Sequence, residues 1–333
     1  MTLSKTYINL LLGLLAAFSL WVVWYIAIDS NMEKPYNPYT PNEYVRNVNV
    51  TVMNGEGHWA YRFYSPSALH YPDKNRTTFS QPVLKLYQEN APEWQAAAKQ
   101  GEAFYGNTEI HLWGNVILSQ PKGNHNVSTQ VMTQSAIVYP DSRTVTSQDK
   151  IIALRPDATV SSVGMKLDVI HQTLELLSQV HGIYQHKSNK PIDITSESAE
   201  LVKFKETGAG ATVFQRNVKL IQAQSLLVTP QLTVYTDKND QLTKAVAKGQ
   251  GSTYTSKQAV NKPPFIATAS EIQYLPLQHE VYLVGNAKAS QGVNSYSAPV
   301  IHYHIDKDSV VSKQGRIKMI ILPKLFEKTG KSS

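Results

Sequence analysis

Apolar and polar residues alternate with a period of two over most of the chain, from about residue 44 to residue 322. Alternation of this kind places the apolar side chains on one face of a half-buried antiparallel strand. Gly, Asn, Asp and Pro separate the runs, as turns between strands require. The sequence therefore predicts an all-β fold. The clearest runs are Val48, Val50 and Val52; Trp59, Tyr61 and Phe63; Ile110, Leu112, Val116 and Leu118; Leu232, Val234 and Thr236; and Val281 and Leu283.

One long apolar run precedes the alternating region. Residues 7–28 contain no charged residue, and a helix of this length at about 1.5 Å per residue crosses the roughly 30 Å hydrocarbon core of a bilayer. A cleaved signal peptide has a shorter apolar run of about 7–15 residues, so we expect an uncleaved transmembrane helix. Lys5 before it and Asp29 after it predict that residues 1–6 are cytoplasmic and that the bulk of the chain is on the far side.

The remaining length predicts two domains. At 333 residues the chain exceeds one typical domain. Residues 29–43 are rich in proline and predict a tether, and residues 185–191 are polar, basic and end in Pro191. We therefore expect β-domains over residues 44–184 and 192–323, joined by the linker 185–191. The polar tail, residues 324–333, is predicted to be disordered.

A short phrase recurs in both predicted domains. Leu112-Trp113-Gly114-Asn115-Val116 resembles Leu283-Val284-Gly285-Asn286-Ala287, and Val213-Phe214-Gln215-Arg216-Asn217-Val218 is a third copy without the glycine. A Gly-Asn pair inside a strand predicts a bulge or tight bend. The repeat therefore predicts stacked hairpins of one architectural type.

The sequence offers no enzyme signature. Cysteine is absent, which excludes disulfides and thiolate sites. No nucleophile elbow, phosphate loop or dinucleotide fingerprint occurs, and no cofactor is predicted. His302-x-His304 has a spacing that could bind a metal, but no third ligand of clear spacing accompanies it, so we interpret it as an exposed pair on a strand.

Composition and apolar residues leave binding functions open. The net charge of +7 suits an anionic partner, and the predicted location beyond the membrane argues against nucleic acid. Large apolar residues can fill an ordinary core, but a curled sheet that does not close leaves a trough that suits acyl chains. The open ends of such a sheet are pairing sites for another β-domain.

Residues 1–185 resemble the LptC family, the inner-membrane component of lipopolysaccharide transport in Gram-negative bacteria. The motifs are collinear over almost the whole half. They are the N-terminal anchor, Asn54-Gly55-Glu56-Gly57-x-x-Ala60-Tyr61-Arg62, Phe79-Ser80-Gln81-Pro82-Val83-Leu84, Trp94, Leu112-Trp113-Gly114-Asn115-Val116, Thr144-Val145-Thr146-Ser147 and Leu174-Glu175-Leu176.

Residues 190–323 resemble the LptA family of OstA-like periplasmic bridge proteins, so the chain is similar to a fusion of the two families. The motifs are Lys190-Pro191-Ile192-Asp193-Ile194-Thr195-Ser196, Thr268-Ala269-Ser270-Glu271-Ile272-x-Tyr274, Val281-x-Leu283-x-Gly285-Asn286-Ala287, Ala298-Pro299-x-Ile301-x-Tyr303 and Ile321-Leu322-Pro323.

The resemblance implies two rolled-sheet β-jellyroll domains, each with a hydrophobic groove for lipid A. It implies lipopolysaccharide as ligand. The protein partners that it implies are the permease subunits of the inner-membrane Lpt ABC transporter, and a further LptA-like bridge protein or the outer-membrane lipopolysaccharide translocon. The acyl-contacting positions that it implies are Val48, Phe79, Trp113 and Leu174 in the first domain and Ile192, Tyr254 and Tyr274 in the second.

The fusion adds a prediction about the junction. We expect the C-terminal edge of the first domain to pair with the strand that begins at Ile192, so that the two grooves are continuous. Two other interpretations remain open. One is a membrane-anchored periplasmic scaffold that pairs by edge strands and carries no lipid. The other is a jelly-roll hydrolase of cell-wall glycan, for which the sequence offers no preferred carboxylate pair.

Overall fold

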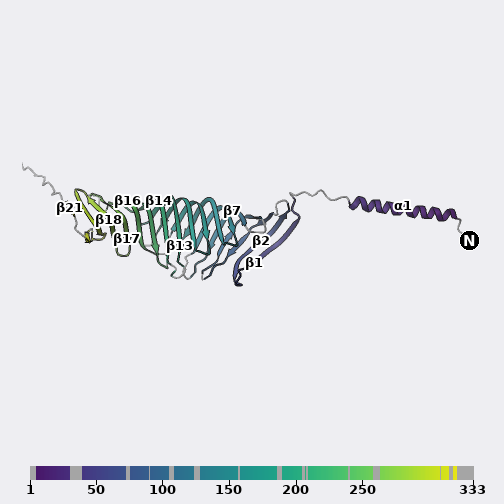
Figure 1. The fold of residues 1–333 in the computed structure, drawn as a ribbon, viewed down its shortest axis with the longest axis horizontal. Helices are drawn as coiled ribbons and strands as arrows, with labels where there is room; N and C mark the ends of the chain where they lie inside the picture. The colour runs from purple at the N-terminus through teal and green to yellow at the C-terminus, as the bar shows by residue number, and fades with distance from the viewer. Residues whose placement is uncertain are drawn as a thin grey trace, which may run out of the picture.

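In the computed structural model, the described residues form one helix near the N-terminus and a long antiparallel sheet after it (Figure 1). The predicted tether and linker lie mostly, and the predicted tail entirely, outside the described residues. The structure describes residues 5–30, 40–72, 76–89, 91–104, 109–123, 128–156, 158–185, 190–204, 207, 209–238, 241–257, 263–307, 309–314 and 318–320.

Twenty-one strands make up the sheet in the described part of the chain, which confirms the β prediction. The elements are α1 (Lys5–Ser30), β1 (Glu43–Met53), β2 (Trp59–Tyr71), β3 (Arg76–Ser80), β4 (Val83–Leu86), β5 (Trp94–Ala97), β6 (Gln100–Phe104), β7 (Glu109–Gln120), β8 (Thr129–Tyr139), β9 (Thr144–Arg155), β10 (Ala158–Asp168), β11 (Thr173–Tyr184), β12 (Ile192–Ser196), β13 (Ser198–Lys203), β14 (Gly210–Gln222), β15 (Ser225–Thr236), β16 (Leu242–Ser256), β17 (Phe265–Leu275), β18 (Glu280–Gln291), β19 (Asn294–His304), β20 (Ser309–Gln314) and β21 (Lys318–Ile320).

The helix α1 covers the whole of the predicted segment 7–28. It lies beyond the β1 end of the sheet (Figure 1). Within the described residues, no helix combines the length and the apolar character that crossing a bilayer requires.

The strands follow one another along the molecule in the order of the sequence (Figure 1). From β7 to β11 each strand pairs with the next, and the same holds from β14 to β19. At four positions two short strands pair with successive parts of the same long strand. They are β3 and β4 on β2, β5 and β6 on β7, β12 and β13 on β11, and β20 and β21 on β19. Because neighbours in sequence are neighbours in space, the fold has two ends, at β1 and at β20–β21.

The two halves of the chain share this one sheet. Strand β11 pairs with β12 through five residue pairs, from Val180↔Ser196 to Tyr184↔Ile192. It pairs with β13 through four more, from Thr173↔Val202 to Leu176↔Ala199. The prediction that the strand beginning at Ile192 pairs with the C-terminal edge of the first half is confirmed.

The recurring Gly-Asn phrase forms a bulge each time, as predicted. Gly114 and Asn115 have φ angles of 81° and 61°, and Gly285 and Asn286 have 75° and 53°. The register of β7–β8 shifts between Trp113 and Val116, and that of β18–β19 shifts between Val284 and Ala287. A left-handed backbone at two successive positions bends the strand, and glycine adopts it at little cost.

The third copy forms the same bulge without glycine. Arg216 and Asn217 have φ angles of 62° and 51°, and the β14–β15 register shifts beside them. Glu197 holds both side chains, since its carboxylate accepts from Arg216 Nε and from Asn217 Nδ2 at 2.6 Å each. The carboxylate therefore supports a backbone conformation that a non-glycine residue adopts only with strain.

Candidate functional site

One connected apolar core runs through both halves of the sheet. In β7 the predicted inward residues Ile110, Leu112, Val116 and Leu118 are at most 3 % exposed. Leu232 and Leu283 occupy equivalent inward positions in the second half and are completely buried. Alternation along each strand produces this inner face, because successive side chains point to opposite sides of the sheet.

The core continues across the junction between the halves. Leu176 and Val180 of β11 belong to the same buried cluster as Ile194 of β12 and Ala199 of β13. The register sets Leu176 opposite Ala199 and Val180 opposite Ser196. The apolar inner face is therefore unbroken where one half ends and the next begins.

Six of the seven predicted lipid-binding residues lie on this inner face. Phe79 is a core residue, 9 % exposed, and its ring meets the edge of Phe63 with centroids 4.6 Å apart. The other five are partly buried and pack against the core at intervals along its length. They are Val48, Leu174, Ile192, Tyr254 and Tyr274.

The structure does not bring Trp113 to the inner face. Its neighbour Leu112 turns inward, and so does Val116 after the bulge. The indole Nε1 of Trp113 donates instead to Gln100 Oε1 at 2.8 Å, in an exposed setting. Trp113 therefore lies on the opposite face of β7 from the core.

Sequence reasoning missed other partly buried residues of the same kind. Alternation within each strand could have identified them, because a residue two positions from a buried residue lies on the same face. Tyr184 follows the buried Val180 and Gly182 at intervals of two, and Tyr296 lies two positions before the buried Ala298. The missed residues that pack against the core include Trp94, Val160, Tyr184, Leu220 and Tyr296.

Two tyrosines of the second half, Tyr254 and Tyr274, lie at the edge of the apolar core. Burial raises the pKa of Tyr274, and repulsion from Tyr254 and Asp306 raises it further. The Tyr254 hydroxyl lies 3.2 Å from Ser225 Oγ. These positions offer apolar ring faces with a polar tip, as residues at the boundary of an apolar site do.

The two ends of the sheet differ from its middle in exposure. Among the described residues, strand β1 pairs with β2 alone, and Tyr44, Val45, Val50 and Met53 are between 41 % and 58 % exposed. At the other end, Val311 of β20 is 44 % exposed. Such edges carry backbone groups that another strand can pair with.

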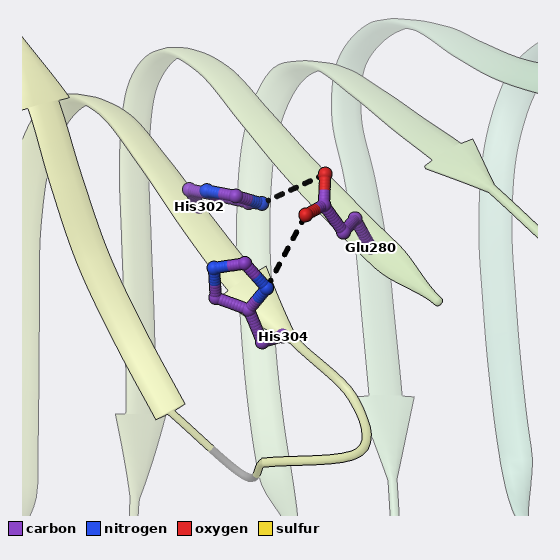
Figure 2. A group of neighbouring side chains, drawn as sticks. All are labelled: Glu280, His302 and His304. Atoms are coloured by element: carbon purple, nitrogen blue, oxygen red, sulfur yellow. Dashed lines mark ion pairs between the residues drawn. The ribbon is translucent and has the colours of Figure 1, made fainter. Parts of the chain in front are cut away.

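A polar cluster lies on the outer face of the β18–β19 hairpin, because its residues alternate with the core residues Val281, Leu283, Ile301 and Tyr303. Figure 2 shows three of its side chains, Glu280, His302 and His304. The β18–β19 register sets Glu280 opposite His304 and Tyr282 opposite His302. Glu280 Oε2 is 3.1 Å from His302 Nε2, and Glu280 Oε1 is 3.3 Å from His304 Nδ1. The Tyr282 hydroxyl donates to Glu280 Oε2 at 2.9 Å.

The interpretation of His302 and His304 as an exposed pair is wrong for His302, which is 1 % exposed. The Tyr282 ring stacks on it with centroids 4.2 Å apart, and the His304 ring lies 4.0 Å away. A third group is also present, because strand pairing brings Glu280 to both imidazoles. The hydrogen bond from Tyr282, with the nearby imidazoles, lowers the pKa of Glu280 against the opposing effect of desolvation.

Among the described residues, two groups of His and carboxylate side chains could hold a metal ion. One is Glu280, His302 and His304, of which His302 is buried and the other two are partly buried. The second is Glu56, His58 and Glu89, all of which are exposed. Only the first is built on the paired strands of the sheet.

Two family models match the chain in succession. The model described as lipopolysaccharide-assembly, LptC-related, matches residues 12–185. The model described as LptA/(LptD N-terminal domain) LPS transport protein matches residues 193–309.

Individual lipopolysaccharide export proteins each match part of the chain. The lipopolysaccharide export system protein LptH of Pseudomonas aeruginosa is 28% identical over 145 residues, covering 40% of this chain and 81% of that protein. The lipopolysaccharide export system protein LptC of Escherichia coli K12 is 22% identical over 166 residues, covering 49% of this chain and 86% of that protein. The crystal structure of LptH from Pseudomonas aeruginosa, an LptA-homologous periplasmic component, aligns with a TM-score of 0.35 at 26% identity, covering 40% of this chain and 96% of that one.

Proposed function

The chain belongs to the LptC-related family of lipopolysaccharide-assembly proteins and carries an LptA/LptD N-terminal-type domain after it, and from this we propose that it carries lipid A acyl chains along its inner face. The family assignment makes the chain a component of lipopolysaccharide transport and not an enzyme. The finer proposal is that one chain provides two consecutive stretches of the lipid path.

The unbroken apolar core across the β11–β12 junction is the observation that supports this proposal most strongly. Each methylene group that leaves water gains about 0.8 kcal/mol, so several acyl chains provide a large driving force. We propose that partly buried apolar side chains at the edge of the core, such as Val48 and Tyr254, contact such chains. The net charge of +7 favours the phosphates of lipid A.

We further propose that each half is a rolled β-jellyroll whose inner face opens as a groove when lipid enters. Bulges at Gly114–Asn115 and Gly285–Asn286 support this, since they bend strands in both halves. The opening is needed because residues such as Leu84, Leu232 and Ile301 are at most 1 % exposed.

The proposed location follows from the N-terminal segment. The uncharged residues 7–28 would anchor the chain in the inner membrane, with the N-terminus cytoplasmic and the sheet periplasmic. The exposed strand β1 lies toward the α1 end, and we propose that it pairs with a β-domain of the transporter permease subunits. The β20–β21 end would then meet a further LptA-like bridge or the outer-membrane translocon.

The filled core favours a second candidate function. If the inner face never opens, the protein is an anchored scaffold that joins envelope partners through β1 and β20–β21 without carrying lipid. The complete burial of Leu232 and Leu283 is the observation in favour of this reading.

Photo-crosslinking in cells that make lipopolysaccharide distinguishes the two candidates. A photoreactive residue is placed at Phe79, at Tyr254 and, as the outward-facing control, at Trp113. The lipid-carrier proposal expects lipopolysaccharide adducts at Phe79 and Tyr254 and none at Trp113. Adducts at Phe79 alone would make the second half a strand-pairing adaptor. Folded, expressed variants without adducts at either inner site would establish the scaffold.

A further inference from the structure

The outer face of the β18–β19 hairpin carries a ligand set that the transport function does not use. Glu280 and Tyr282 alternate with the buried Val281 and Leu283, so they point away from the lipid path. His302 and His304 alternate in the same way with Ile301 and Tyr303 on the neighbouring strand. The cluster is therefore separated from the apolar interior by the sheet itself.

We propose that Glu280, His302 and His304 form a binding site for a divalent transition-metal ion of the zinc class (Figure 2). Imidazole nitrogen and carboxylate oxygen are the ligand types that zinc takes in three-ligand sites, where the fourth position holds water. One ligand atom from each of the three side chains lies within 4.8 Å of the others.

The two spacings between the carboxylate and the imidazoles are close to those around a tetrahedral ion. Bonds of about 2.0–2.1 Å to N and O place neighbouring ligand atoms of a tetrahedron about 3.3 Å apart. The Glu280 oxygens are 3.1 Å from His302 Nε2 and 3.3 Å from His304 Nδ1. The two imidazoles approach different oxygens of Glu280, so the carboxylate binds the ion through both oxygens or rotates to bring one oxygen to both imidazoles.

Tyr282 is the positioning residue of this site. Its hydroxyl donates to Glu280 Oε2 at 2.9 Å, and its ring stacks on His302 at an interplanar angle of 9°. Hydrogen bonds from outside the ligand shell orient metal ligands and raise affinity. Tyr282 thus orients two of the three ligands without binding the ion.

The place of the site gives the ion a structural role. An ion held by Glu280 on β18 and by both histidines on β19 joins the two strands. Strand β19 is also the one with which both β20 and β21 pair. Bound metal therefore stabilises the strand on which the distal end of the sheet is built.

Zinc binding to the full chain in detergent tests the site. The protein is purified with a tag that contains no histidine, stripped with chelator and titrated with Zn²⁺ against a chromophoric chelator near neutral pH. Co²⁺ then reports tetrahedral geometry through its visible absorption. The isosteric variant E280Q and the partly exposed H304A remove one ligand each, and circular dichroism checks their folding.

The control is H58A, which removes the histidine of the exposed Glu56–His58–Glu89 group. Wild type and H58A are expected to bind one Zn²⁺ with the Co²⁺ absorption bands of a tetrahedral site. E280Q and H304A are expected to lose at least about tenfold in affinity, together with those bands. Y282F is expected to lower affinity while the stoichiometry stays the same.

Three results would overturn the proposal: no zinc bound by the wild type, equal affinity in wild type and both ligand variants, or loss of binding in H58A alone. None of these results bears on lipid crosslinking at Phe79 and Tyr254, because the site lies on the other face of the sheet.

Discussion

At the scale of single residues, buried hydroxyl groups stabilise the bends of the strands. Thr229, which is 2 % exposed, donates to the carbonyl of Gln231 at 3.0 Å and lies 2.9 Å from Ser252 Oγ. Bulged strands leave carbonyl groups outside the regular ladder, and buried carbonyls need a donor. Four other residues repeat the bond to the carbonyl two positions later: Ser65, Thr133, Ser162 and Ser196.

Replacing Thr229 by valine tests this role. T229V keeps the shape of the side chain but leaves the carbonyl groups of Gln231 and Lys248 without the hydroxyl. We expect a loss of about 1–3 kcal/mol in the free energy of unfolding, measured by urea denaturation. The control is T253V on the neighbouring strand. The Thr253 hydroxyl donates to the Gly251 carbonyl in an exposed setting, where water can replace it. Equal midpoints for the two variants would contradict the role assigned to Thr229.

Alternation within each strand predicts most of the inward-facing residues, and Trp113 is the predicted lipid-binding residue that violates it. Leu112 and Val116 have the inward phase of β7, whereas Trp113 has the outward one. Its size and its place in a family-like motif suggested the interior, and the period-two rule alone would have excluded it. The buried hydroxyls were not predicted because Ser and Thr are read as outward or turn residues.

The position of Glu280 beside His302 and His304 could not be predicted from the alternation pattern alone. Counting back from the turn between β18 and β19 sets Glu280 opposite Ile305. The bulge at Gly285–Asn286 shifts the register by one residue and brings His304 there instead. The repeated phrase predicted the bulge, but its effect on distant pairing requires the whole hairpin to be built.

At the scale of elements, the junction between the halves is an ordinary strand pair. The chain enters β12 after the linker and adds it to the edge that β11 leaves open. His181 and Asp193 approach to 3.1 Å across this pair, on the exposed side. The presence of the strands could be predicted from the sequence. The β11–β12 pairing could be predicted as well, because each half has an open edge strand next to the linker.

Cutting the linker tests whether strand pairing alone holds the halves together. A protease site inserted within residues 186–189 is cleaved in the folded, detergent-solubilised chain. We expect the halves to co-elute in gel filtration, because nine residue pairs and a shared apolar core remain. Before cleavage the linker holds the two halves at an effective concentration on the order of millimolar. The strictest test is therefore to dilute the cleaved protein to well below that concentration.

The variant I194P gives the comparison for this experiment. Ile194 pairs with Gly182 on one side and with Leu220 on the other, and proline is not tolerated in a central strand. After cleavage, I194P halves are expected to separate at concentrations where wild-type halves stay together. Wild-type halves that elute apart at every concentration would show that the linker, and not the strand pair, makes the junction.

At the scale of the whole molecule, the position of each strand along the sheet follows its position in the sequence. The sheet begins at β1 beside the α1 end and finishes at β20–β21, and the apolar core extends through both halves between them (Figure 1). If lipid moves along the inner face as proposed, it passes from the first half to the second at the β11–β13 pairing. Leu174 lies at this crossing, opposite Leu201, and packs against the core.

A charge at the crossing should therefore divide the path. L174R places a guanidinium at a partly buried inner position, whereas L177R places the same group on the outer face of the same strand, where Leu177 is 39 % exposed. An unpaired charge against acyl chains costs several kcal/mol, so we expect L174R to reduce lipopolysaccharide adducts at Tyr254 by about tenfold or more. Adducts at Phe79 should persist in L174R, and L177R should keep adducts at both sites. Tyr254 adducts that persist in L174R would mean that lipid passes the junction by another route. Equal losses at Tyr254 in the two variants would mean that the added charge acts without regard to the inner face, and loss at Phe79 as well would mean that the two halves fill as one compartment.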